Sequence, residues 1–140
     1  MILIPAIDLK DNKVIRLYKG KFDEVTAYEL KPVDAAQKWI DMGAKWLHVV
    51  DLDGAQTGEM KNINLIKEII KKFPHIPIQV GGGIRFEEAI KSLLDSGAAR
   101  VILGTKAVPD GRIGSVVGTM WELSNEVLQY GEDKIAVSLD

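Results

Sequence analysis

Short apolar runs alternate with helix-length amphipathic segments along this chain, and this alternation limits its possible folds more than any other feature. Near-continuous apolarity over a few residues is typical of strands covered on both faces, as in parallel sheets. Such runs occupy residues 2–7, 46–50, 76–80, 101–103 and 135–139. Helical patterns with proline or glycine at their ends lie between them, at 32–43, 63–73, 86–97 and 120–131. The sequence therefore predicts a parallel α/β fold.

The order of these elements also predicts where a ligand binds. Right-handed crossovers place the helices on one side of a parallel sheet and the carboxyl ends of the strands at one rim. That rim is where α/β proteins bind their ligands. The sequence therefore predicts that functional residues lie at or just after the end of each strand.

Composition excludes several classes of protein. The chain has 140 residues, 46% of them hydrophobic and 27% charged, which predicts one globular domain over 1–140. A net charge of -2 without a basic stripe argues against nucleic-acid binding, and no membrane-length segment or leader is visible. The absence of cysteine and the presence of only two histidines argue against a metal site, and no cofactor is expected. The predicted location is cytoplasmic.

Two of the predicted strands open into turns that contain glycine. Residues 79–85 read Gln-Val-Gly-Gly-Gly-Ile-Arg, and residues 101–105 read Val-Ile-Leu-Gly-Thr. Glycine lets backbone N–H groups approach a phosphate closely, and a following helix adds its dipole. Tight turns alone explain a single Gly-Gly-Gly equally well, but two such turns on neighbouring strands favour a phosphorylated small-molecule ligand.

Three predicted strands end in aspartate, at Asp8, Asp51 and Asp140. Two carboxylates on opposite sides of a pocket can act as general base and general acid without a metal, if their environments separate their pKa values. Asp8 and Asp140 form the better pair, because their strands would lie across a barrel from each other. For Asp51, capping of the following loop is an equally good interpretation.

Six segments together resemble the ribotide isomerase family of histidine biosynthesis. These segments are Ile-Pro-Ala-Ile-Asp-Leu at 4–9, Arg-Leu-Tyr-Lys-Gly at 16–20, Leu-His-Val-Val-Asp-Leu-Asp-Gly-Ala at 47–55, Val-Gly-Gly-Gly-Ile-Arg at 80–85, Ile-Leu-Gly-Thr at 102–105 and Ser-Leu-Asp at 138–140. The resemblance covers residues 1 to about 106 and resumes near 130. It implies a TIM-type (β/α)8 barrel of two similar halves, each binding one phosphate of the substrate.

The resemblance also implies an activity, an Amadori rearrangement of a bisphosphorylated aminoaldose to an aminoketose by metal-free acid and base catalysis. Asp8 would be the general base and Asp140 the general acid. The residues implied for substrate or phosphate binding are Gly82, Gly83, Gly104, Thr105, Arg85 and Asp51. Asp51 would polarise or position the site, and Arg85 would orient substrate unless it makes only a surface ion pair.

Two further features have weaker interpretations. His48 lies on the opposite strand face from Asp51 by the two-residue period, which favours a core histidine over a catalytic one. Residues 13–28 predict a hairpin that acts as a lid, from which Arg16 and Lys19 would reach substrate, and a plain surface hairpin is equally consistent.

The chain corresponds to an N-terminal half-barrel plus a fifth strand, whereas a complete (β/α)8 barrel takes about 250 residues. Residues 109–119 lack a helical stripe and predict an insertion or an altered junction. The alternative to an isomerase is a non-catalytic phosphate-binding half-barrel that self-associates through its open edges.

Overall fold

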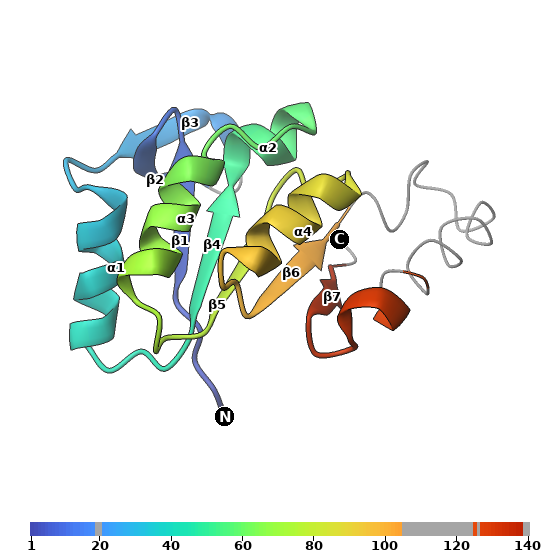
Figure 1. Ribbon diagram of the computed structural model, residues 1–140. Coiled ribbons are helices and arrows are strands. Elements are labelled where there is room, and N and C mark those ends of the chain that lie inside the picture. The colour runs from blue at the N-terminus through green and yellow to red at the C-terminus, as the bar shows by residue number, and fades with distance from the viewer. Residues whose placement is uncertain (19–20, 105–124, 126, 139–140) are drawn as a thin grey trace.

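The computed structural model describes residues 1–18, 21–104, 125 and 127–138. These residues form a seven-stranded sheet in the order β3-β2-β1-β4-β5-β6-β7 (Figure 1). The strands are β1 (Ala6–Lys10), β2 (Lys13–Tyr18), β3 (Lys21–Ala27), β4 (Leu47–Asp51), β5 (Ile78–Gly81), β6 (Arg100–Leu103) and β7 (Ile135–Val137). The helices are α1 (Pro32–Asp41), α2 (Leu52–Thr57), α3 (Ile63–Lys72) and α4 (Glu87–Asp95), and residues 127–130 are also helical.

Strands β1, β4, β5, β6 and β7 pair in parallel, which confirms the predicted parallel α/β fold. The predicted hairpin is also present, since β2 pairs antiparallel with both β1 and β3. Its first turn contains two non-glycine residues with positive φ, Asp11 at 49° and Asn12 at 61°. Positive φ at both central residues is the geometry of a type I′ turn, which joins tightly twisted strands.

The first strand begins later than predicted. Residues 2–7 were expected to form it, but β1 starts at Ala6, and Ile2 and Leu3 are 71% and 79% exposed. Pairing explains the difference, because β4 first meets β1 where His48 lies opposite Ala6. Before this pairing, Pro5 O still accepts from His48 N at 2.9 Å, while Ile2 and Leu3 lie ahead of it. The fifth predicted strand is β7, which ends at Val137. The predicted junction at 109–119 lies outside the described residues.

In the described part of the chain, the helices cover one face of the sheet. Figure 1 shows α1, α3 and α4 side by side against that face. Alternate strand residues, such as Leu47 and Val49 of β4, are buried beneath the helices. The intervening positions, His48 and Val50, face the other way and are half-buried. This arrangement agrees with the prediction that right-handed crossovers place the helices on one side of the sheet. We call the side away from the helices the open face.

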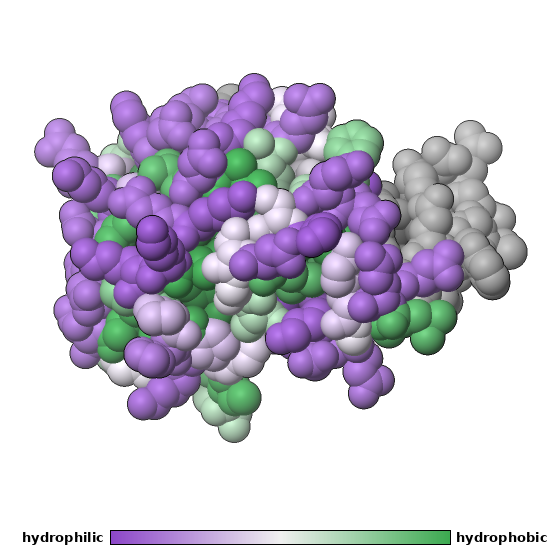
Figure 2. All heavy atoms as spheres, in the orientation of Figure 1, coloured by the Kyte–Doolittle hydropathy of each residue, from purple (hydrophilic) through white to green (hydrophobic). Residues whose placement is uncertain are grey.

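The helices form because their apolar residues recur every three or four positions. In α3, Ile66, Ile69 and Ile70 are all buried against the sheet, and each such side chain contributes about 1.5–3 kcal/mol through removal from water. The outer sides of the helices are mainly hydrophilic (Figure 2). The buried core consists of residues from the strands and from the inner sides of the helices: Ile7, Leu9, Val14, Ala35, Ala36, Leu47, Val49, Ile66, Ile69, Ile70, Ile78, Val80, Ile84, Ile90, Leu93, Ala98, Val101, Leu103 and Ile135.

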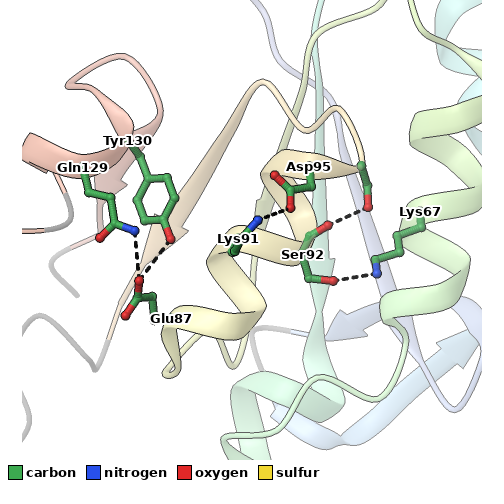
Figure 3. A network of polar contacts seen from close by, with 8 residues as sticks. Lys67, Glu87, Lys91, Ser92, Asp95, Gln129 and Tyr130 are labelled. Atoms are coloured by element: carbon green, nitrogen blue, oxygen red, sulfur yellow. Dashed lines mark hydrogen bonds and ion pairs between the residues drawn. The ribbon is translucent and has the colours of Figure 1, made fainter.

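Polar contacts link α4 to its neighbours on both sides (Figure 3). Lys67 Nζ of α3 donates to Ser92 Oγ at 2.6 Å. On the other side, Glu87 accepts hydrogen bonds from Gln129 Nε2 at 3.0 Å and from the Tyr130 hydroxyl at 3.4 Å. These contacts connect neighbouring helical segments at the surface of the molecule. Each such surface pair contributes little to the free energy of unfolding.

Candidate functional site

The loop after β5 can be built only with glycine at two positions. Gly82 and Gly83 have φ of 94° and 73°, which disfavours residues with a side chain. Space gives a second reason, because a Cβ at Gly83 would lie 2.5 Å from the Gly54 backbone and one at Gly82 would collide with the Asp51 backbone. Tight packing against the start of α2 therefore accounts for both glycines, and it also holds the loop's N–H groups in place. We call residues 81–83 the glycine loop.

A hollow of about 270 Å³ opens beside this loop. It is lined by His48, Val50, Ala55, Gly81, Gly82, Gly83, Ile84, Arg85, Ile102, Gly104 and Ser138. We call it the glycine hollow. The structure thus brings together Gly82, Gly83, Gly104 and Arg85, as the sequence predicted, while Thr105 lies outside the described residues. A Cβ added at Gly104 would have no atom within 4 Å, so this glycine borders open space.

Arg85 is exposed at the rim of the glycine hollow. Its guanidinium lies over Gly58, where a Cβ would come within 2.5 Å of Nη1. The salt bridges of the described residues do not include Arg85. The alternative interpretation, a surface ion pair, therefore has no support in this part of the chain, and the cation remains available to an anionic ligand.

Asp8 shares the open face with the glycine hollow. In the sheet register Asp8 lies opposite Val50, and Val50 lies opposite Gly81, so the three form one row across β1, β4 and β5. Two strand spacings separate Asp8 from Gly81, about 10 Å. Burial raises the pKa of the Asp8 carboxyl above its usual value. Its expected partner, Asp140, lies outside the described residues.

Asp51 lies on the opposite side of β4, under the helices, and is 0% exposed. Its carboxylate accepts hydrogen bonds from Gly54 N at 2.9 Å, Asn62 N at 2.7 Å and Asn62 Nδ2 at 2.7 Å. With these partners it caps α2 at its N-terminus. Its carboxylate is therefore engaged in this cap, and Asp51 is not among the residues that line the glycine hollow.

Asp53 belongs to the same buried group, although the sequence did not single it out as a site residue. Its Oδ2 accepts from Asp11 N at 2.7 Å and from Asn62 Nδ2 at 2.9 Å. Burial opposes ionisation, but these hydrogen bonds and the nearby charges of Lys61 and Lys10 outweigh it, so the pKa of Asp53 lies below its usual value. Asn62 itself is 1% exposed.

His48 differs from the predicted core histidine, because it is half-buried and lines the glycine hollow. Gln79 Oε1 accepts from Arg100 Nε at 2.9 Å and Nη2 at 2.7 Å, which leaves Gln79 Nε2 to meet His48 Nδ1 at 3.2 Å. Burial and then the charge of Arg100 lower the pKa of His48. The neutral ring therefore accepts at Nδ1 and holds its proton on Nε2.

Among the hairpin residues that the structure describes, none lines the glycine hollow. Arg16 lines a separate hollow of about 490 Å³, together with Asp8, Tyr28, Lys38 and Trp39. Lys19 lies outside the described residues. Within the described part of the chain, there is no group of three or more metal-binding side chains and no helix long and apolar enough to span a membrane.

The fold and this geometry define a class: half of a parallel α/β barrel with a hollow on its open face, beside the glycine loop. Residues 2–140 match the family model described as "Histidine biosynthesis protein", and the chain belongs to this family. A relative from Carboxydothermus hydrogenoformans is 49% identical over 140 residues, covering 100% of this chain and 53% of its own. One from Acetivibrio thermocellus is 46% identical over 140 residues, covering 100% and 54%.

A third relative, from Thioalkalivibrio sulfidiphilus, is 50% identical over 108 residues, covering 77% of this chain and 45% of its own. All three are named as phosphoribosyl imidazole-4-carboxamide isomerases. The chain thus spans about half the length of the curated relatives that it matches.

Proposed function

We propose that this chain provides the N-terminal half of a ribotide isomerase, which converts a bisphosphorylated aminoaldose to an aminoketose in histidine biosynthesis. One observation carries the proposal: the Asp8 carboxyl and the glycine hollow share the open face, in a row through Val50. A spacing of about 10 Å suits a sugar phosphate whose phosphate and reacting carbons lie at opposite ends. The names of the relatives support this activity over a non-catalytic half-barrel.

The glycine hollow binds one substrate phosphate in this proposal. N–H groups of Gly82, Gly83, Gly104 and Thr105 donate to the phosphate oxygens, and Arg85 adds a positive charge. His48, which lines the hollow, offers its Nε2–H as an additional donor to the substrate. A second phosphate is bound by the part of the barrel that this chain lacks.

Asp8 and Asp140 perform the chemistry in this proposal. Asp140 protonates the ring oxygen, the C1–O bond breaks and the ring opens to an iminium ion at C1. Asp8 then takes the proton from C2, which gives an enol-amine; C1 next gains a proton while the C2 hydroxyl loses its own, and the C2 carbonyl of the aminoketose forms. The raised pKa of Asp8 makes its carboxylate a stronger base than an exposed aspartate. No electron acceptor is needed, because the reaction is an internal rearrangement.

A chimera tests the proposed function. The chain is joined to the part of the Carboxydothermus hydrogenoformans relative that it does not cover, and isomerisation of the ribotide is measured. We expect turnover by this chimera and a loss of about 10²–10⁴-fold in Asp8→Asn. The matched control is Asp41→Asn on the exposed surface of α1, which should leave turnover unchanged. A folded chimera that binds substrate without converting it would favour the non-catalytic alternative.

A further inference from the structure

Asn62 joins three separate segments of the chain in one buried hydrogen-bond network, and we infer that it is a positioning residue that couples the β1–β2 turn to the glycine loop. The inference rests on the proposed phosphate site. Asn62 lies just before α3 and is 1% exposed. Every polar group of its side chain has a partner within this network.

On one side, Asn62 holds the turn between β1 and β2. Its Oδ1 accepts from Asn12 N at 3.0 Å, while Asp53, to which Asn62 Nδ2 donates, accepts from Asp11 N at 2.7 Å. Both turn residues have positive φ, which is costly for residues other than glycine. These two hydrogen bonds therefore help to hold the hairpin that contains Arg16 in one orientation.

On the other side, Asn62 fixes the residue that supports the glycine loop. Its N and Nδ2 donate to the two oxygens of Asp51, and Asp51 Oδ1 in turn accepts from Gly54 N at 2.9 Å. Gly54 packs directly on the glycine loop, because a Cβ there would lie 2.7 Å from Gly82 O. The position of the glycine loop thus depends on the orientation of the Asp51 carboxylate, which Asn62 sets.

Electrostatics explains why an asparagine occupies this place. Asp51 and Asp53 are 0% and 6% exposed, and Asn62 Nδ2 donates to both carboxylates. An amide is the short side chain that offers two donors on one atom and an acceptor on another. Removing the amide takes one donor from each of two neighbouring buried carboxylates, which is costly in a medium of low dielectric constant.

Coupling between two sites is reciprocal. Phosphate bound at the glycine loop must therefore change the environment of the β1–β2 turn. The test is a titration of the ¹⁵N-labelled chain with inorganic phosphate, followed by NMR. We expect the amides of Asp11 and Asn12 and the side-chain amide of Asn62 to shift with the same Kd as Gly82 and Gly83. In Asn62→Ala, phosphate should bind at least about five-fold more weakly, the lower end of typical couplings, and the turn amides should stop responding.

Two control variants separate positioning from loss of stability. Ile69→Val removes one methylene from a fully buried side chain of α3, remote from the network, and should leave the Kd for phosphate unchanged. Asn12→Gly keeps the backbone N–H that donates to Asn62 Oδ1, and glycine suits the positive φ at this position. This variant should therefore also bind phosphate with an unchanged Kd.

The outcomes distinguish this inference from the proposed function. A folded Asn62→Ala chain with an unchanged Kd overturns the coupling and leaves the phosphate site standing. If Gly82 and Gly83 of the unsubstituted chain do not respond to phosphate, both the site and the coupling are wrong. Should Asn62→Ala fail to fold, the unsubstituted chain decides: a shared Kd at the turn supports the coupling, and a turn that is silent at saturating phosphate overturns it.

Discussion

Asp8 and Gly81 lie on opposite sides of the same residue, Val50, in the register of three parallel strands. This relationship puts the raised-pKa carboxyl and the glycine hollow on one face, at a separation of about 10 Å. A single rigid sheet therefore holds both groups, so their separation does not depend on loop motion. Such fixed geometry is what acid and base catalysis on a bound sugar phosphate requires.

The pH dependence of the Asp8 carboxyl is the first prediction. Because burial raises the pKa of Asp8, its ionisation disfavours the folded state. The protonated carboxyl therefore adds stability to the folded state below the unfolded-state pKa. This stability is lost as the pH rises through the folded-state pKa. In urea unfolding from pH 3 upward, the chain should lose stability relative to Asp8→Asn above about pH 4. Parallel curves for the two proteins would contradict this.

Asp53 should show the opposite dependence. Its pKa is lowered in the folded chain, so its ionised form adds stability above the unfolded pKa, and this is lost as the pH falls through the folded pKa. We expect Asp53→Asn to be less stable than the unsubstituted chain at pH 7 and the difference to shrink below about pH 4. Thermal unfolding at the two pH values measures it, and a difference independent of pH would refute the assignment.

Gly104 offers a substitution that tests phosphate binding without disturbing the fold. A Cβ at this position meets no atom within 4 Å, and Gly104 is not among the glycines with positive φ. Gly104→Ala should therefore keep the unfolding midpoint and weaken phosphate binding, because its methyl group enters the hollow. Calorimetric titration with inorganic phosphate makes the comparison. Ser92→Ala on α4 is the control, and equal affinities in all three proteins would argue against phosphate in this hollow.

The parallel strands were predictable because each lies in or beside a short apolar run, and the hairpin because its two stretches alternate. The face of β4 that the helices cover was not predictable. Leu47, Val49 and Val50 are all apolar, so the pattern did not show which alternate residues the helices cover. Asp51 was placed at the binding rim because it ends its strand, and His48, on the opposite strand face, was assigned to the core although it lines the glycine hollow.

Contacts made at long range were also invisible in the sequence. Asn62 lies 11 residues from Asp51 and 50 from Asn12, and no local period links them. Helix α2 has 6 residues, which is too short for an amphipathic pattern, although Asp51 and Gly58 at its ends are typical capping residues.

Self-association of this chain by itself remains a prediction. Ile2, Leu3 and Met42 are 71%, 79% and 68% exposed. They line one hollow of about 480 Å³ with Trp39. Sedimentation velocity should show dimers or larger species, and Met42→Lys should shift them toward monomer. The chimera is the comparison, and we expect it to be monomeric. A compact monomer of the unsubstituted chain would contradict the prediction.

Loss of deuterium from C2 of the substrate tests the central claim most directly, because it reports the proton transfer assigned to Asp8. The chimera is given ribotide labelled with deuterium at C2, and release of the label to water is followed by mass spectrometry. The account predicts release by the unsubstituted chimera and a rate about 10²–10⁴-fold lower in Asp8→Asn, with the ribotide still bound. Release by Asp8→Asn at the unsubstituted rate would show that another group takes this proton.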